Sequence, residues 1–207
     1  MTEQRAPYKT VATNRALVIG GSGGIGTILV ALLEEEGWDI ASPGSKELNL
    51  IDEIAIQNWC LSESAPPFGA FGLVIILAGK LAPDEWQYKG MQDYLEAYAL
   101  HAAGPVVLLA ELQKRRLIEW WTKVVLVSSV GAINTGAVDL AYGCAKAALE
   151  KAHKALSEYA SWRCYLVRLD LVDTRMLRQL PVDTLHGRLV MSPQEAAELI
   201  LKEASIL

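Results

Sequence analysis

The chain has 207 residues, of which 52% are hydrophobic and 21% are charged, so it is long enough to bury a full core and too apolar to be disordered. Its formal net charge is −5 at pH 7, and its basic residues are scattered, which argues against a nucleic-acid partner. Uninterrupted apolar runs are too short to cross a bilayer, so no membrane partner is expected either.

The N-terminal segment of the chain and its cysteines indicate the cellular compartment. Residues 1–14 are predicted to form a polar tail without the apolar core of a signal peptide, followed by a single domain over residues 15–207. The three cysteines lie far apart without metal-ligand spacing, which predicts reduced, buried thiols and no metal site. We therefore expect a cytoplasmic protein.

Short apolar runs alternate with longer stretches of helical periodicity along the chain. The runs predict strands over residues 16–19, 38–41, 48–50, 73–77, 123–127 and 164–169. The helical stretches predict helices over residues 25–36, 52–60, 92–114, 139–160 and 194–204. Pro105 is expected to kink or break its helix, whereas Pro193 suits the first position of the last helix.

This alternation predicts the fold class. Strands separated by helices form right-handed βαβ units, so we expect a doubly wound parallel sheet, the Rossmann fold, with about six strands and helices on both faces. Ligands in this architecture bind beyond the carboxyl ends of the strands. Functional residues are therefore expected directly after the strands.

The segment after the first predicted strand is rich in glycine. Five of the seven residues from Gly20 to Gly26 are glycine, and a helix is predicted to follow. Glycines allow a tight turn and a close approach to a pyrophosphate, whose charge is met by amides at the helix N-terminus. No Lys-Ser or Lys-Thr pair follows, which disfavours a P-loop. We expect dinucleotide contacts from Gly20, Ser22, Gly23, Gly24, Ile25 and Gly26.

A second pattern joins a serine, a tyrosine and a lysine. Tyr142 and Lys146 form Y-x-x-x-K on one predicted helix, and Ser129 follows the preceding strand, thirteen residues before Tyr142. Residues four apart share one side of a helix, and a nearby cation favours the phenolate of a tyrosine whose ordinary pKa is near 10. The alternative is a surface Tyr–Lys pair with a serine that caps the strand.

Together these patterns resemble the short-chain dehydrogenase/reductase family over residues 15–200. The glycine segment is similar to its T-G-x-x-x-G-x-G element, with Ile19 in place of the threonine. The resemblance implies hydride transfer between a nicotinamide cofactor and a small-molecule carbonyl or alcohol. Tyr142 would be the general acid/base, Lys146 would tune it and hold the ribose, and Ser129 would polarise the carbonyl.

The same resemblance assigns further residues. Ala78 and Gly79 match the end of the N-N-A-G element and would shape the turn over the adenine ribose, while Thr174 would bind the nicotinamide amide. Asn49 and Leu50 would lie at the adenine. His101 stands where the family often has an asparagine that holds a proton-relay water. A histidine satisfied by a helix carbonyl is the alternative.

The residues after the second predicted strand bear on the choice of cofactor. Members that prefer NAD generally end this strand with an acidic residue that binds the ribose diol. Here Ser42 takes that place, and Ser45 and Lys46 follow. Hydroxyls and a cation suit a 2′-phosphate, so NADP is predicted, with NAD as the alternative.

The resemblance also suggests an assembly and leaves other functions open. In the family, the helices that correspond to residues 92–114 and 139–160 commonly form the subunit interface, so a homodimer or homotetramer is expected. Only six residues separate Ala41 from Leu48, where the family usually has a helix, and a minimal member is therefore expected. A pteridine-reductase-like enzyme and a non-catalytic dinucleotide-binding redox sensor or scaffold are the alternatives.

Overall fold

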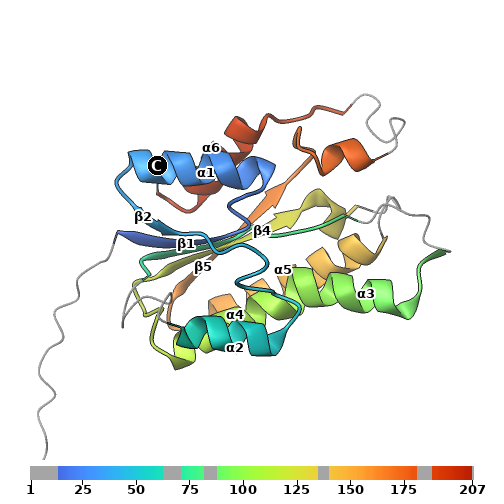
Figure 1. The fold of residues 1–207 in the computed structure, drawn as a ribbon. Coiled ribbons are helices and arrows are strands. Elements are labelled where there is room, and N and C mark those ends of the chain that lie inside the picture. The colour runs from blue at the N-terminus through green and yellow to red at the C-terminus, as the bar shows by residue number, and fades with distance from the viewer. Residues whose placement is uncertain (1–13, 63–70, 82–87, 135–139, 181–187, 207) are drawn as a thin grey trace, which may run out of the picture.

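The computed structural model describes residues 14–62, 71–81, 88–134, 140–180 and 188–206; the predicted polar tail lies almost wholly outside them. Within these ranges, five parallel strands form one sheet in the order β2-β1-β3-β4-β5 (Figure 1). The strands are β1 (Arg15–Ile19), β2 (Asp39–Ala41), β3 (Leu73–Ile76), β4 (Lys123–Ser129) and β5 (Arg163–Leu169). From β1 the chain first adds β2 on one side and then adds β3, β4 and β5 on the other side. The predicted doubly wound sheet is therefore confirmed.

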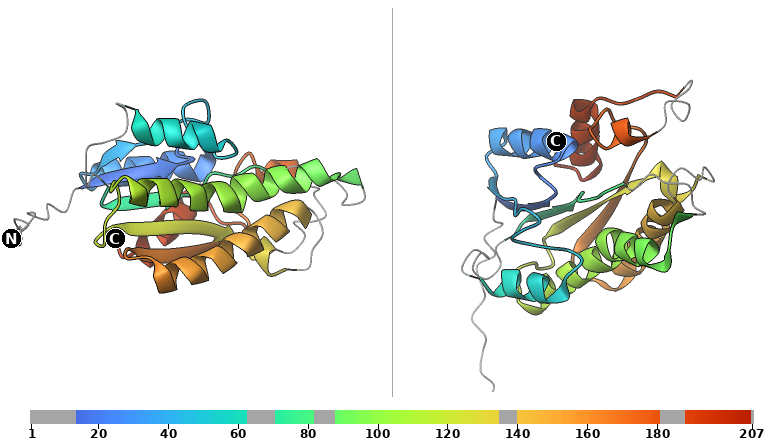
Figure 2. Two further views of the ribbon diagram at one scale, coloured as in Figure 1. Left: turned by 90° about the horizontal axis from the view of Figure 1, so that it is seen from below. Right: turned by 45° about the vertical axis from the view of Figure 1, so that its right-hand side comes forward.

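Helices cover both faces of the sheet (Figure 1). One layer contains α1 and α6, and the other contains α2, α4 and α5, with α3 continuing α4 beside α5 (Figure 2). The helices are α1 (Gly24–Glu35), α2 (Glu53–Leu61), α3 (Met91–Tyr98), α4 (Gly104–Lys114), α5 (Leu140–Tyr159) and α6 (Pro193–Glu203). As predicted, Pro193 occupies the first turn of α6, where Ser192 and Glu195 form a capping box.

The strands read as apolar runs because both faces of the sheet are buried. All four residues of β3 are buried, as expected of a parallel strand between two helical layers. Along β1 the side chains alternate between the layers. Ala16 and Val18 pack in the core with α1 and α6, and Leu17 and Ile19 pack in the core with α2 and α4.

The structure corrects one sequence-based expectation about the elements and confirms another. Residues 48–50 form no strand: the amide of Leu48 binds the carbonyl of Gly44 in a turn, and the sheet has five strands among the described residues instead of about six. The side chains of Leu48 and Leu50 are nevertheless buried, and this burial produced the strand-like pattern. The helix over 92–114 is interrupted before Pro105, at a π-helical turn (Ala99–Ala103), and Pro105 lies in the first turn of α4.

Two further expectations concern the cysteines and the apolar stretches. Cys60 is buried and Cys164 is half-buried, but Cys144 is exposed, so the expectation of buried thiols is wrong for Cys144. Among the described residues, one helical stretch, Met91–Lys114, is long and apolar enough to cross a membrane by length and composition. Core helices can pass the same test, and Leu108 of this stretch is fully buried against the sheet.

Candidate functional site

The glycine turn joins β1 to α1 in the geometry that the sequence predicted. Gly20 has a positive φ of 95°, and a Cβ there would lie 2.7 Å from the backbone nitrogen of Ala78. A Cβ on Gly26 would lie 2.2 Å from the carbonyl oxygen of Gly20. Only glycine fits at these two positions, so the turn has backbone without side chains there, next to the N-terminus of α1. Ser22, Gly23 and Gly24 are exposed there, and Ile25 packs against the core.

Two distant residues predicted to bind cofactor lie against this turn. A Cβ on Gly24 would lie 2.9 Å from Cγ2 of Thr174, which follows β5. The hydroxyl of Ser42, directly after β2, donates to the carbonyl of Val18 at 3.1 Å and occupies the space beside Gly21. The fold thus gathers the ends of β1, β2 and β5 around one exposed helix N-terminus.

The remaining residues assigned to the adenosine end are less closely gathered. Ser45 and Lys46 are exposed in a turn, and Leu50 points into the core with 4% exposure. A ligand could therefore meet Leu50 only through its backbone. The side chain of Asn49 accepts a hydrogen bond from the amide of Ile51 at 3.3 Å.

Ser129 and Tyr142 approach each other across Gly131. The Gly131 amide donates to Oγ of Ser129 at 3.2 Å. A Cβ on Gly131 would lie 3.5 Å from that Oγ and 3.6 Å from Cε1 of Tyr142, so both side chains border the same side of this glycine. Gly143 permits the approach, because a Cβ there would lie 2.8 Å from the carbonyl oxygen of Gly131. Both side chains are half-buried and can therefore reach a ligand.

Lys146 lies one helical turn beyond Tyr142 and is 5% exposed. Its ammonium donates to the carbonyl of Val127 at 2.7 Å and lies 5.7 Å from the centre of the Tyr142 ring. Burial lowers the pKa of Lys146 from 10.5 to about 8. The cation is therefore still present near neutral pH and acts in a medium of low dielectric constant beside the phenol.

His101 lies at the π-helical turn and is 1% exposed. Its Nε2 lies 3.0 Å from the carbonyl oxygen of Lys80, and its ring contacts Tyr142 edge to face with the centroids 4.9 Å apart. Burial and, to a smaller extent, the charge of Lys146 lower the pKa of His101 to about 3. The ring is therefore neutral at working pH, so it can donate or accept a hydrogen bond but carries no charge.

His101 contacts the loop after β3. The alternative interpretation required a contact with a helix carbonyl instead. A Cβ on Gly79 would lie 2.8 Å from Cε1 of His101, so the histidine fixes a loop that was assigned to the cofactor. Its Nδ1 is buried and has no hydrogen-bond partner among the described residues. His101 therefore links the loop after β3 to Tyr142.

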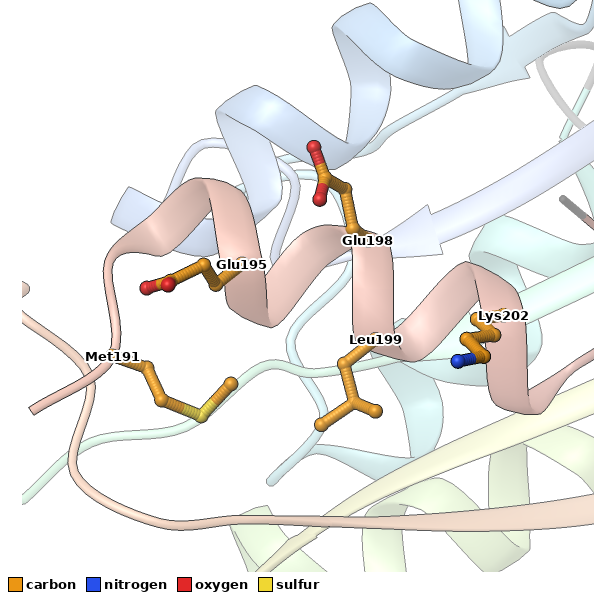
Figure 3. Close-up of a pocket in the computed structure, with 5 residues that line it drawn as sticks. All are labelled: Met191, Glu195, Glu198, Leu199 and Lys202. Atoms are coloured by element: carbon orange, nitrogen blue, oxygen red, sulfur yellow. The ribbon is translucent and has the colours of Figure 1, made fainter. Parts of the chain in front are cut away.

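A small cavity of about 70 Å³ lies beside Tyr142 and His101. Leu100 and Ala97 line it on one side, and Lys80 and Glu96 form an ion pair of 3.4 Å at its border. A larger groove lies on α6 (Figure 3) and takes no part in this cluster. The smaller cavity is thus the one that borders Tyr142 and His101.

Three further residues on which this geometry depends were not predicted from the sequence. Gly131 and Gly143 let Ser129 approach Tyr142, and a glycine inside a strongly predicted helix was a signal for Gly143. The hydroxyl of Thr27 donates to the carbonyl of Gly23 at 2.9 Å and closes the glycine turn. In the described part of the chain, no group of three or more His, Cys, Asp or Glu side chains could hold a metal ion.

The sheet order and the glycine turn define a Rossmann-type α/β protein. No family model and no curated protein matches the chain. Among solved structures it is similar to a small-chain dehydrogenase in complex with NADPH, with 20% identity, a TM-score of 0.79, and coverage of 93% of this chain and 91% of that one. The NADP-bound protein ElxO is 15% identical with a TM-score of 0.77, and the alignment covers 93% of this chain and 91% of that one.

Two further similarities come from named organisms. A short-chain dehydrogenase family protein from Francisella tularensis is 17% identical with a TM-score of 0.75, and the alignment covers 93% of this chain and 91% of that one. The ligand-free aldohexose dehydrogenase of Thermoplasma acidophilum is 16% identical with a TM-score of 0.74, covering 93% and 88%. The chain therefore has the fold of the short-chain dehydrogenases, as the sequence motifs implied.

Proposed function

We propose that this chain is an NADP-dependent oxidoreductase of the short-chain dehydrogenase/reductase family that acts on a small-molecule carbonyl or alcohol. The observation that carries the proposal is the convergence of Ser129, Tyr142 and the buried cation of Lys146 at the carboxyl end of β4. Two structural neighbours that hold NADPH or NADP support the choice of cofactor. Steady-state turnover of a carbonyl substrate panel with NADPH tests the proposal.

The residues present fit a dinucleotide. The backbone at Gly20 and Gly26 leaves no room for a side chain, and the exposed N-terminus of α1 favours a pyrophosphate. Thr174 borders this turn and would meet the nicotinamide end. When bound, the cofactor supplies or accepts the hydride.

The proton in this mechanism is handled by the chain's own side chains. In reduction, Tyr142 donates its phenolic proton to the substrate oxygen, and in oxidation the phenolate accepts it. The Lys146 ammonium stabilises the phenolate electrostatically. The Ser129 hydroxyl donates a hydrogen bond to the same substrate oxygen and favours the negative charge that develops on it.

The turn after β2 leads to a prediction about NADPH. Lys46 is exposed, and its ammonium can reach a 2′-phosphate near Ser42. We expect Lys46→Ala to weaken NADPH binding about 10-fold, which corresponds to roughly 1.4 kcal/mol, and to leave NADH binding unchanged. Isothermal titration with both cofactors measures this, with Lys154→Ala as a control. Equal losses for both cofactors, or tighter binding of NADH by the wild type, would contradict it.

A second prediction concerns His101. We expect His101→Asn to keep or raise turnover, because an amide can still hydrogen-bond the backbone of Lys80 and hold a water near Tyr142. His101→Ala should lower turnover, since it removes both the 3.0 Å contact with Lys80 and the ring contact with Tyr142. Kinetics on a substrate of the wild type compares the two variants. Equal losses in both would show that the imidazole itself is required.

Two other functions would use the same site. A pteridine-reductase-like enzyme would reduce a C=N bond with the same tyrosine, and a redox sensor or scaffold would bind the dinucleotide without turnover. Turnover of pterins, but not of carbonyl compounds, would favour the first. Tight NADPH binding without any turnover would favour the second.

We also propose a homo-oligomer built on α3, α4 and α5. The outer side of α3 exposes Met91, Leu95 and Tyr98, and these residues lie three or four positions apart on one face of the helix. Such a row of apolar side chains on a surface helix suits a subunit interface. Light scattering of the purified chain measures the assembly, and a monomeric mass would contradict it.

A further inference from the structure

Three elements that carry site residues meet at one carboxylate, that of Glu150. α5 lies over β4 and β5 on the same face of the sheet (Figure 1). From α5, the side chain of Glu150 accepts a hydrogen bond at 2.8 Å from the hydroxyl of Ser128 on β4. It also accepts two hydrogen bonds from the guanidinium of Arg168 on β5, at 2.9 and 2.6 Å. We call these three side chains the Glu150 clamp.

The Glu150 clamp lies near the carboxyl ends of both strands. Ser128 and Arg168 are direct partners in the register of β4 and β5, so the carboxylate bridges a cross-strand pair. The next pair in this register is Ser129 and Leu169, the last residues of their strands. One strand therefore ends in the serine assigned to the substrate oxygen, and the other continues into the loop that carries Thr174.

On α5, the clamp lies close to the tyrosine and lysine of the candidate site. Glu150 follows Lys146 by one helical turn, and Lys146 follows Tyr142 by one turn. The ammonium of Lys146 donates to the carbonyl of Val127, the residue before Ser128. The helix thus holds two consecutive residues of β4, one through the lysine and one through the glutamate. The position of the phenol and the ammonium relative to the end of β4 depends on both contacts.

The charge of the clamp is balanced by its own members. The side chains of Glu150 and Arg168 are 14% and 38% exposed, so solvent screens their charges only in part. The hydrogen bonds from Arg168 lower the pKa of Glu150 against the opposing effect of burial, and the charge of His153 on α5 lowers it further. His101, which faces Lys146 from the π-helical turn, is neutral. An unbalanced carboxylate four residues from Lys146 would attract its ammonium.

We propose that Glu150 is a positioning residue whose carboxylate fixes α5 against the ends of β4 and β5, a role that rests on the oxidoreductase function proposed above. Because Arg168 neutralises this carboxylate, the Lys146 ammonium is not drawn away from Tyr142. Glu150 acts through the side chains that it places and not by contact with the reacting atoms.

The role is tested through the pKa of Lys146, measured by NMR of the chain labelled with carbon-13 at lysine Cε, with Lys146→Met to assign the signal. Arg168→Met leaves the carboxylate unbalanced and should raise this pKa from about 8 to about 9, since an opposite charge nearby favours the ammonium. Glu150→Gln leaves Arg168 unbalanced and should lower the pKa below about 8. The double variant should restore the wild-type value.

Turnover with NADPH should change in the same order. The loss of turnover at high pH should move to higher pH in Arg168→Met and to lower pH in Glu150→Gln. At pH 6, where Lys146 is charged in all variants, Glu150→Ala should lower turnover roughly 10-fold, because misplaced reacting groups lose rate. Glu150→Gln should lose less at this pH, because its amide oxygen still accepts from Ser128. Glu158→Gln, at an exposed position of α5, is the matched control and should change neither readout.

The direction of the pKa changes separates this role from a merely structural one. Loosening of the fold would hydrate the Lys146 ammonium and raise its pKa in both single variants, whereas the proposal requires opposite directions. Changes in the same direction, or no change in either folded variant, would overturn the proposal. Circular dichroism checks the fold, and Arg168→Gln replaces Arg168→Met if the latter does not fold. A wild type without turnover would refute the oxidoreductase function, and the titration, which needs no substrate, keeps the two failures distinct.

Discussion

Replacement of Tyr142 by phenylalanine is expected to lower turnover by about 10²- to 10⁴-fold, the usual contribution of a general acid or base. The ring and its edge-to-face contact with His101 remain, but the proton donor beside Lys146 is lost. NADPH affinity should change little, because the phenol meets the substrate oxygen and not the dinucleotide. Steady-state kinetics and cofactor titration measure the two effects separately.

Tyr159→Phe is the matched control for this prediction. Tyr159 ends the same helix but is 80% exposed, so the loss of its hydroxyl should leave turnover unchanged. Ser129→Ala should lower turnover without changing cofactor binding, while Lys146→Ala should lower both. If Tyr142→Phe keeps the turnover of a substrate that the wild type accepts, the site assignment is wrong.

The pH dependence of the reaction should reflect the loss of charge on Lys146. Lys146 keeps its charge below its pKa of about 8 and loses it above that value. The electrostatic support of the Tyr142 phenolate is therefore present at neutral pH and fades as the pH rises through 8. A pH profile of turnover measures this loss.

Gly24→Asp is expected to weaken dinucleotide binding at least about 100-fold, which corresponds to roughly 2.8 kcal/mol. Gly24 is the first residue of α1, and its missing side chain leaves room beside Thr174. An aspartate places a carboxylate where the helix N-terminus would otherwise bind the negatively charged pyrophosphate. Isothermal titration with NADPH gives the loss.

Gly24→Ala separates the two causes of that effect. Alanine adds the Cβ that crowds Cγ2 of Thr174 at 2.9 Å but adds no charge, so it should weaken binding less than aspartate. Thermal unfolding shows whether each variant keeps the fold. A wild type that binds neither NADPH nor NADH would refute the assignment of the glycine turn to a dinucleotide.

The amino-acid pattern is sufficient to predict the unit of β1, glycine turn and α1, and the helix that carries Tyr142 and Lys146. These features are local: apolar runs, glycines and i, i+4 spacing act over a few residues, so their pattern specifies their structure. The parallel sheet follows from the alternation of strands and helices. The strand predicted over residues 48–50 is wrong, because leucines two apart, such as Leu48 and Leu50, can be buried in a turn as well as in a strand.

How distant segments meet is seen only in the folded chain. Ser42 against Gly21, Thr174 beside Gly24, and His101 bound to Lys80 each join residues that lie on separate elements. The open edge of β5 and the groove on α6 are likewise features of the tertiary structure alone. Such contacts depend on the packing of layers and on which backbones can approach closely. A pattern within a short window of sequence predicts neither the packing nor the close approach.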